Sequence, residues 1–474
     1  MFVVRNLTTS EWWEPSRPDR RLHGVLFEEE GRGWLLKLDG SFERIELDSH
    51  LASEGPITVP LTSPSEFPVL CGITGGGKLL TLFNCQVMAA TWPLFGNSGQ
   101  LVVWPTILAY DVHFENLDDF RLTSLSVRYS NLDAWAATSG FSIDLGSSDN
   151  YSVSIQYTKP EAIEVGTADG LTITLGFSAS GPTITSPQAQ VHLEQTAWVS
   201  VAASDGRPYE ELLRTSTVLS DLITLGVGQP VRPLEMEGEC NAQMGPGGPA
   251  TSCSFKLVHN RDPISPILPD AKAWDMLFTF PEIRNRLPDL LCAWFDGQDT
   301  IGPLYALYFG TVRSPSMYVE HRFLNMFQAL ESYDRRTNVQ DSEKAIAHRE
   351  RLDRILNAVN SRDKKWLKGR LKHSHEPTAV DRIRRLVAKV HAGWLLDDND
   401  VTLAADFRNF YTHFGLDVEQ RLPPKKERSR KLHNLAIRLQ MLCEITLLDA
   451  IGFSSDEVRE RIERTRRLEN RLTR

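Results

Sequence analysis

The spacing of hydrophobic residues changes near residue 315, and this change restricts the chain to a fold with two different parts. Up to about residue 200, segments such as GWLLKLDG and LTSLSVRYS alternate apolar and polar residues with a period near two, which is typical of β-strands. After Ser314-Pro315, apolar residues recur at helical spacing, as in MYVEHRFLNMFQAL. We therefore expect an α+β multidomain protein, with an antiparallel β-rich region, either a sandwich or a strongly curved sheet, followed by an all-helical bundle.

Three domains are expected from these patterns. They are a β-rich domain at 1–205, a mixed α/β extension at 206–314 and a helical domain at 315–474. In the extension, the pattern predicts a helix at 208–225, a loop rich in Gly and Pro at 238–253, and further helix within FPEIRNRLPDLLCAWFDG. In the helical domain, further helices are expected at 341–359, 361–372, 377–396, 400–415, 427–452 and 455–472.

The composition is that of a globular protein in a reducing compartment. The 474 residues are 41% hydrophobic and 24% charged, which is enough to bury cores without disulfides. Six cysteines are scattered along the chain with no CxxC pair. The N-terminus lacks a signal-peptide pattern, and no apolar run reaches the ~18 residues that a membrane span needs. We expect a cytoplasmic protein without a membrane segment.

Charge is distributed unevenly between the two parts. Residues 315–474 contain 32 Lys and Arg against 24 Asp and Glu, a net of +8, so the net charge of −9 for the whole chain leaves −17 for residues 1–314. A basic region on an acidic body is one way to direct a domain at an anion, and nucleic acid is the first candidate. The other explanation is that long helices collect Lys and Arg on solvated faces, and the charge count does not separate the two.

The segment DFRNFYTHFG, residues 406–415, places Arg408, Asn409 and His413 on a predicted helix. Asn409 and His413 are four residues apart and lie on one face, whereas Arg408 is about 140° around the axis from His413. This geometry permits a site without requiring one, although the long Arg408 side chain can reach a site beside His413 if a second copy of the helix supplies the rest. The expected caps of the helix are Asn399, Asp400 or Thr402 at its start and Gly415 at its end.

Several segments resemble one known family. RNFYTH resembles the Arg-x(4–6)-His signature of HEPN domains, including the polar residue after Arg that is usual in the ribonuclease members. HRFLNMFQALESYDRR resembles the first helix of the ApeA-type HEPN domain, except that Asp334 stands where a histidine is expected. In the first half, RRLHGVLFEEEGRGWLLKLDG, CGITGGGKLLTLFNC and VRYSNLDAWAATSGF resemble parts of the accompanying N-terminal domain. The resemblance is weakest between residues 180 and 270.

The resemblance implies an anti-phage ribonuclease that acts by abortive infection, with RNA, tRNA among the candidates, as its substrate. HEPN nucleases share one site between two protomers, so we expect a homodimer or higher oligomer formed through the HEPN domain, with no metal and no cofactor. In such a site His413 takes the proton of the ribose 2′-OH, a second His413 protonates the leaving 5′-oxygen, and Arg408 stabilises the phosphorane. Asn409 binds the phosphate or fixes the His413 tautomer. The expected products carry a 2′,3′-cyclic phosphate and a 5′-hydroxyl.

The β-rich region is then expected to sense an unknown phage trigger or to regulate the nuclease. The competing hypothesis is a non-catalytic HEPN protein that binds a nucleotide or a partner and whose β-rich domain is a receptor module. Substitution of Arg408 or His413 separates the two, because only an enzyme loses its growth toxicity while it remains folded.

Other candidate motifs predict no site. GITGGGK at 72–78 is followed by Leu79 and a strand pattern, whereas a phosphate loop needs Ser or Thr and a helix there; a hairpin turn is expected instead. HSHE at 373–376 and the pair Cys240 and Cys253 lack further ligands at metal-binding spacing. RLPPKKERSRKL at 421–432 is either a solvated helix start or a surface that contacts RNA phosphates.

Overall fold

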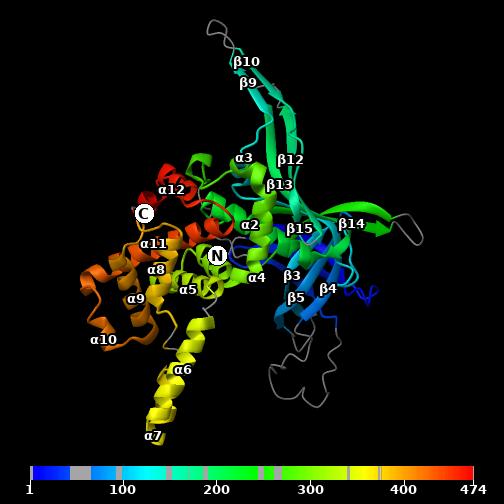
Figure 1. Cartoon of the computed structure of the whole chain (residues 1–474). Helices are drawn as coiled ribbons and strands as arrows, with labels where there is room; N and C mark the ends of the chain where they lie inside the picture. The colour runs from blue at the N-terminus through cyan, green and yellow to red at the C-terminus, as the bar shows by residue number, and fades with distance from the viewer. Residues whose placement is uncertain are drawn as a thin grey trace, which may run out of the picture. The chain divides into compact units, whose positions relative to one another are not determined.

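A computed structural model describes most of the chain (Figure 1). The chain divides into two compact units. Unit 1 comprises Met1–Ser220 and Val231–Asp270, and unit 2 comprises Asp221–Pro230 and Ala271–Arg474. Because these units are defined by internal contacts and not by independent folding, the three domains expected from the sequence stay a prediction. The described residues are 4–42, 66–91, 99–145, 152–168, 170–184, 191–243, 250–260, 270–338, 342–371, 374 and 376–472.

Unit 1 is built on a closed antiparallel barrel. Among the described residues, β5 pairs with both β4 and β6, and this second pairing joins the two ends of the β4-β1-β2-β3-β6 series. Of the two forms left open by the sequence, the strongly curved sheet is therefore present. The barrel strands are β1 (Val4–Trp13), β2 (Leu22–Glu29), β3 (Gly33–Asp39), β4 (Glu66–Thr74), β5 (Leu79–Thr91) and β6 (Gln100–Trp104).

The alternating residues of these strands fill the barrel. Trp12 is fully buried and lies directly over Gly72, where a Cβ atom would come within 2.5 Å of the indole ring. Gly72 is thus required for close approach rather than for its backbone angles. The segment GITGGGK forms the β4–β5 hairpin, in which the Thr74 backbone N–H bonds to Lys78 O, so the predicted turn is confirmed.

The sheet continues beyond the barrel through β7 and ends at β11. Two of these strands, β14 and β15, run through the predicted loop at 238–253, so that prediction was wrong except for 244–249, which lie outside the described residues. The pairing sets Cys240 directly opposite Cys253, both as free thiols. The elements here are β7 (Ile107–Tyr110), β15 (Ala250–His259), β14 (Pro233–Gln243), β8 (Arg121–Tyr129), β13 (Val191–Pro208), β12 (Leu171–Ile184), β11 (Ile163–Ala168), α1 (Leu132–Ala136) and α2 (Tyr209–Val227). The boundary between the two units falls within α2, between Ser220 and Asp221.

A separate two-stranded sheet, β9 (Phe141–Leu145) with β10 (Val153–Tyr157), also belongs to unit 1. Its register places Ile143 opposite Ile155 and Leu145 opposite Val153. Because side chains alternate along a strand, these four aliphatic groups share one face, and all four are exposed.

Unit 2 is helical, as the sequence predicts for residues after 315, and it also contains α4. None of the helices among the described residues is long and apolar enough to cross a membrane. The elements are η1 (Ala273–Asp275), α3 (Phe280–Ile283), η2 (Arg284–Arg286), α4 (Leu287–Val312), α5 (Val319–Thr337), α6 (Ser342–Ala358), α7 (Ser361–Leu371), α8 (Ala379–Lys389), α9 (Asp398–His413), α10 (Leu416–Glu419), α11 (Lys425–Ala450), α12 (Ser455–Arg464) and α13 (Arg467–Leu472).

The central helix α11 carries a buried carboxylate that joins three helices. Glu444 is fully buried and accepts hydrogen bonds from Tyr308 on α4 at 2.7 Å, Arg467 on α13 at 2.9 Å and Arg471 at 2.8 Å. Burial by itself would raise the pKa of Glu444, but the two guanidinium groups outweigh it and lower this pKa from 4.5 to about 2. The negative charge of Glu444 is thus compensated at a depth where an unpaired carboxylate would strongly destabilise the fold.

Replacing Glu444 with Gln is expected to lower the free energy of unfolding of unit 2 by about 3–5 kcal/mol at neutral pH, because it leaves the buried Arg467 and the half-buried Arg471 without their partner. Since the pKa is lower in the folded chain than in the unfolded one, this stabilisation is present above about pH 4.5 and is lost as the pH falls toward about 2. Denaturant unfolding of the wild type and of Glu444→Gln should show that the difference in their free energies of unfolding decreases as the pH falls through this range.

The matched control is Glu463→Gln, which breaks the exposed Arg459–Glu463 pair on α12 and should cost at most about 1 kcal/mol. A loss at Glu444 as small as at Glu463 would contradict the role given to the buried cluster.

Candidate functional site

Helix α9 carries the three predicted site residues and is held by one buried face. Val401, Ala404, Ala405 and Phe407 are buried, and α9 packs against α5, α8 and α11. Apolar residues at helical spacing therefore fix which side of α9 faces the bundle. The remaining side, toward the C-terminal end of the helix, presents the polar residues of the motif.

Arg408 is half-buried and oriented by two neighbours. Its Nη1 donates to Asn409 Oδ1 at 3.1 Å, and its Nη2 lies 3.4 Å from Glu331 Oε2 on α5. Glu331 is mostly buried, so its carboxylate is a fixed anchor for the guanidinium. The structure thus brings Arg408 and Asn409 together. It adds Glu331, which lies 77 positions away in the sequence and is marked by no spacing signal.

His413 is the last residue of α9 and is exposed to solvent. Within the described part of the chain its imidazole accepts or donates no hydrogen bond, and Arg408 is turned to Glu331 rather than toward it. A single copy of the chain therefore presents His413 and the Arg408–Asn409 pair without joining them. Any reaction that needs both groups requires a bound substrate or a second copy to bring them together.

The residues after His413 form an apolar surface. Phe414 is 67% exposed and Leu416 is 78% exposed. Phe414 adopts a left-handed conformation, with φ 50°, and its ring contacts those of Phe410 and Tyr411. Such backbone angles are unfavourable for a bulky residue. Phe414 and Leu416 thus expose apolar side chains directly after His413.

The helix caps differ from those expected. Asp397 caps the start of α9 by accepting from the Asp400 backbone N–H at 2.8 Å, in place of the predicted Asn399, Asp400 or Thr402. The left-handed residue that ends α9 is Phe414, and Gly415 follows it in an extended conformation. Several residues of LDDND are competent caps, and only the path of the preceding loop selects among them.

Asp334, the residue that departs from the family pattern, is buried on α5 between two arginines of α8. Its Oδ2 lies 3.2 Å from Arg382 Nη1 and 2.5 Å from Arg385 Nη2, and its Oδ1 accepts from Asn338. This carboxylate joins α5 to α8. Its contacts give it a structural part in the bundle rather than a place beside His413.

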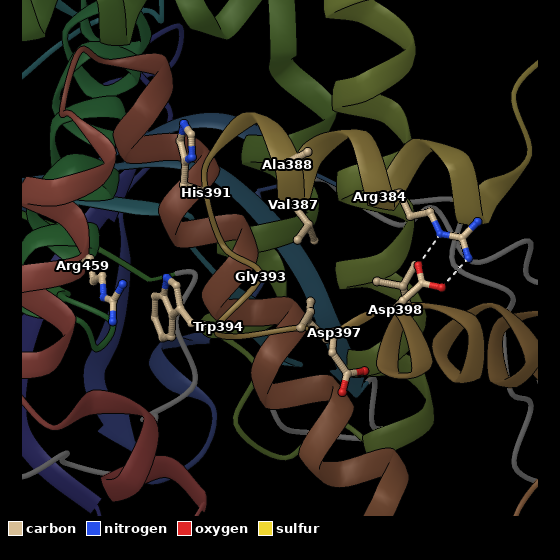
Figure 2. A pocket seen from close by; sticks show the side chains of 11 residues that line it. Arg384, Val387, Ala388, His391, Gly393, Trp394, Asp397, Asp398 and Arg459 are labelled. Carbon is tan, nitrogen blue, oxygen red and sulfur yellow. Dashed lines mark hydrogen bonds and ion pairs between the residues drawn. The ribbon is translucent and has the colours of Figure 1, made fainter.

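A pocket of about 560 Å³ lies elsewhere in unit 2, where α8, the following turn and the start of α9 meet Arg459 of α12. Figure 2 shows Trp394 beside Arg459 at one end and the Arg384–Asp398 ion pair at the other. The pocket shares no lining residue with the predicted site. Among the described residues no group of His, Cys, Asp or Glu is arranged to hold a metal ion; His373 and His375 lie outside them.

Two family models together match most of the chain. Residues 8–294 match the model of ApeA N-terminal domain 1, and residues 324–457 match the model of the Apea-like HEPN domain. The second match encloses Glu331, Arg408 and His413. Neither the curated proteins nor the solved structures gave a match to the chain.

Proposed function

We propose that this chain, which belongs to the ApeA family of HEPN-type defence proteins, cleaves RNA with Arg408, Asn409 and His413. One observation carries the proposal: within the segment that matches the HEPN model, these side chains lie at the solvent-accessible end of a helix that is otherwise fixed by its buried face. Groups that only stabilise the bundle would be expected inside it, as Asp334 is.

The proposed reaction is attack of the ribose 2′-OH on the adjacent phosphorus, with loss of the 5′-oxygen. His413 in its neutral form takes the 2′-OH proton, and a protonated imidazole returns one to the leaving oxygen. Arg408 supplies a permanent cation and a planar donor fork for the equatorial oxygens of the phosphorane. Asn409 Oδ1 accepts a hydrogen bond from the Arg408 guanidinium and so helps to orient that fork. No step calls for a metal ion, and the products end in a 2′,3′-cyclic phosphate and a 5′-hydroxyl.

The second imidazole is proposed to come from another copy of the chain, in a homodimer formed through the HEPN domain. Two features support this. In one copy the Arg408 guanidinium is paired with Glu331 rather than with His413, and Phe414 and Leu416 expose apolar surface immediately after His413. A contact that covers this apolar patch would bring two α9 ends together and bury both.

Unit 1 is proposed to sense infection or to regulate the nuclease. The exposed aliphatic face of β9–β10, formed by Ile143, Leu145, Val153 and Ile155, supports an interaction role, because exposed apolar surface of this kind is typical of protein contacts. An isolated two-stranded sheet is also marginally stable on its own, so a bound protein partner would stabilise it.

Cleavage is tested by incubating purified wild-type and His413→Ala protein with total RNA and with tRNA in EDTA, followed by analysis of the RNA ends. Cyclic phosphate ends from the wild type alone are expected. His413→Ala should remain folded, with a change in stability within about 0.5 kcal/mol, because the side chain is exposed. If RNA from infected cells also stays intact with the wild type, the nuclease proposal fails.

If two copies share one site, a dimer of one wild-type and one His413→Ala chain should be inactive. When wild-type and His413→Ala chains exchange freely at equal amounts, about a quarter of the dimers contain two intact copies. Cleavage should then fall to about a quarter of the all-wild-type rate rather than to about half. An Ile143→Ala chain in place of His413→Ala is the control, since it should leave the rate unchanged. Activity that simply follows the amount of wild-type chain would show that each copy works alone.

The role of unit 1 is tested with Ile143→Lys and Ile155→Lys together. This protein should cleave RNA in vitro like the wild type but lose growth arrest on infection, because only the apolar contact is removed. Ser142→Lys with Ser154→Lys, which adds the same charge to the opposite face of the sheet, is the matched control. Equal growth arrest in both would rule out this face as the sensing surface.

A further inference from the structure

Helices α6 and α7 carry a concentration of cations that neither the site nor the core of unit 2 uses. Within residues 346–371 there are eight Lys and Arg and three Asp and Glu, a net of +5. None of the residues of α7 is buried, so packing does not account for them. The eight cations are Arg349, Arg351, Arg354, Arg362, Lys364, Lys365, Lys368 and Arg370.

These cations also lack carboxylate partners among the described residues. Within the described part of the chain, none of the eight side chains makes an ion pair. The arginines of other helices in unit 2 behave differently, since many of them form an ion pair with a carboxylate. Examples are Arg382, Arg384, Arg385, Arg428, Arg438, Arg461, Arg464, Arg467 and Arg471. The charge of α6 and α7 is therefore available to a ligand, whereas much of the charge elsewhere is already neutralised.

One face of α7 combines charge with an aromatic ring. Trp366 is 63% exposed, and Arg362 and Arg370 lie one turn before and one turn after it on the same side of the helix. Four residues span about 6 Å along the axis, so the face presents a cation, a flat ring and a second cation in a row. This order matches a stretch of single-stranded nucleic acid, in which a base lies between two phosphates.

We propose that α6 and α7 form an RNA-binding arm, in which Trp366 stacks on an unpaired base while Arg362 and Arg370 contact the flanking phosphates. Stacking on an aromatic ring and contact with phosphates are the general means of holding single strands without reading their sequence. The proposal rests on the proposed function only in identifying this RNA as the substrate. RNA binding by the arm itself does not depend on catalysis.

The distribution of residues favours RNA over a membrane surface. A helix that lies on a membrane needs a broad apolar face opposite its charged one. On α7 the cations are spread around the axis, and Leu367 and Leu371 are half-buried. The Nε2 atom of His348 lies 3.0 Å from Leu371 O, which joins α6 to this end of α7. Trp366 is thus left as a single exposed ring among charges.

The test measures binding of a fluorescent single-stranded RNA to full-length His413→Ala protein, so that no cleavage interferes. Adding Trp366→Ala should weaken binding at least about fivefold, the lower end for one base–aromatic stack. Adding Arg362→Ala and Arg370→Ala should lower the slope of log K against log salt by about 1.4, because each contact to a single strand contributes about 0.7.

Trp274→Ala is the matched control, because Trp274 is 67% exposed and also has a lysine, Lys272, over its ring. Equal RNA affinity in all variants, or no RNA binding by the parent protein, would overturn the proposal that α6 and α7 bind RNA. Binding to phosphatidylserine vesicles that depends on Trp366, Arg362 and Arg370, without RNA binding, would show that the two helices bind a membrane instead. Failure of the nuclease proposal gives a different result: the arm binds the RNA, and the wild-type protein leaves that RNA intact.

Discussion

The buried carboxylate of Glu444 is the interaction on which the rest of unit 2 depends. It links α4 through Tyr308 and α13 through Arg467 and Arg471 to the middle of α11. Helix α11 in turn packs against α5 and α9. Helix α5 supplies Glu331, the anchor of Arg408, and α9 supplies Arg408 itself. The two helices that carry the candidate site are therefore packed against the helix that holds this buried charge. A polar group at this depth also specifies one arrangement of the helices, since other arrangements would leave it unpaired.

Ion pairing distinguishes the roles of the arginines in this unit better than their number does. Arg382 is buried against Asp334 and holds two helices together. Arg408 is half-buried and rests on Glu331 at 3.4 Å, a contact that orients the guanidinium without enclosing it. Arg362 and Arg370 have no such contact among the described residues. The excess of basic residues after position 315 therefore includes structural cations, and the formal charge overstates what a ligand can meet.

Hydrophobic spacing predicts the long helix α11 well because its buried residues recur along most of its length. The predicted helix at 427–452 corresponds to α11 at Lys425–Ala450, and the hairpin at GITGGGK was also found. The loop predicted at 238–253 is wrong for its described residues, because Gly at such a position also allows close packing between strands. In the structure Gly238 makes room for the ring of Phe255 on the next strand. That cross-strand contact is not visible in either segment alone.

Pairings between distant segments could not be predicted either, because neither segment alone contains a signal for its partner. Closure of the barrel depends on β5 meeting β6 as well as β4, and the support of Arg408 depends on α5 meeting α9. The residues of the motif were found because they are close together in the chain and similar to a known signature. Glu331 and the exposed pair Phe414 and Leu416 carry no local signature, since an acid on one helix or an apolar residue after another is common.

The position of the Glu444 cluster along the chain has a consequence for how the protein is made. Helices α5, α9 and α11 leave the ribosome before Arg467 and Arg471 do. Until those arginines arrive, the carboxylate of Glu444 has only the hydroxyl of Tyr308 to meet it, and its burial is opposed. The bundle is thus completed only after the whole of unit 1 has been translated. A nascent chain would present a finished α9 end only after its β-rich unit has had time to fold.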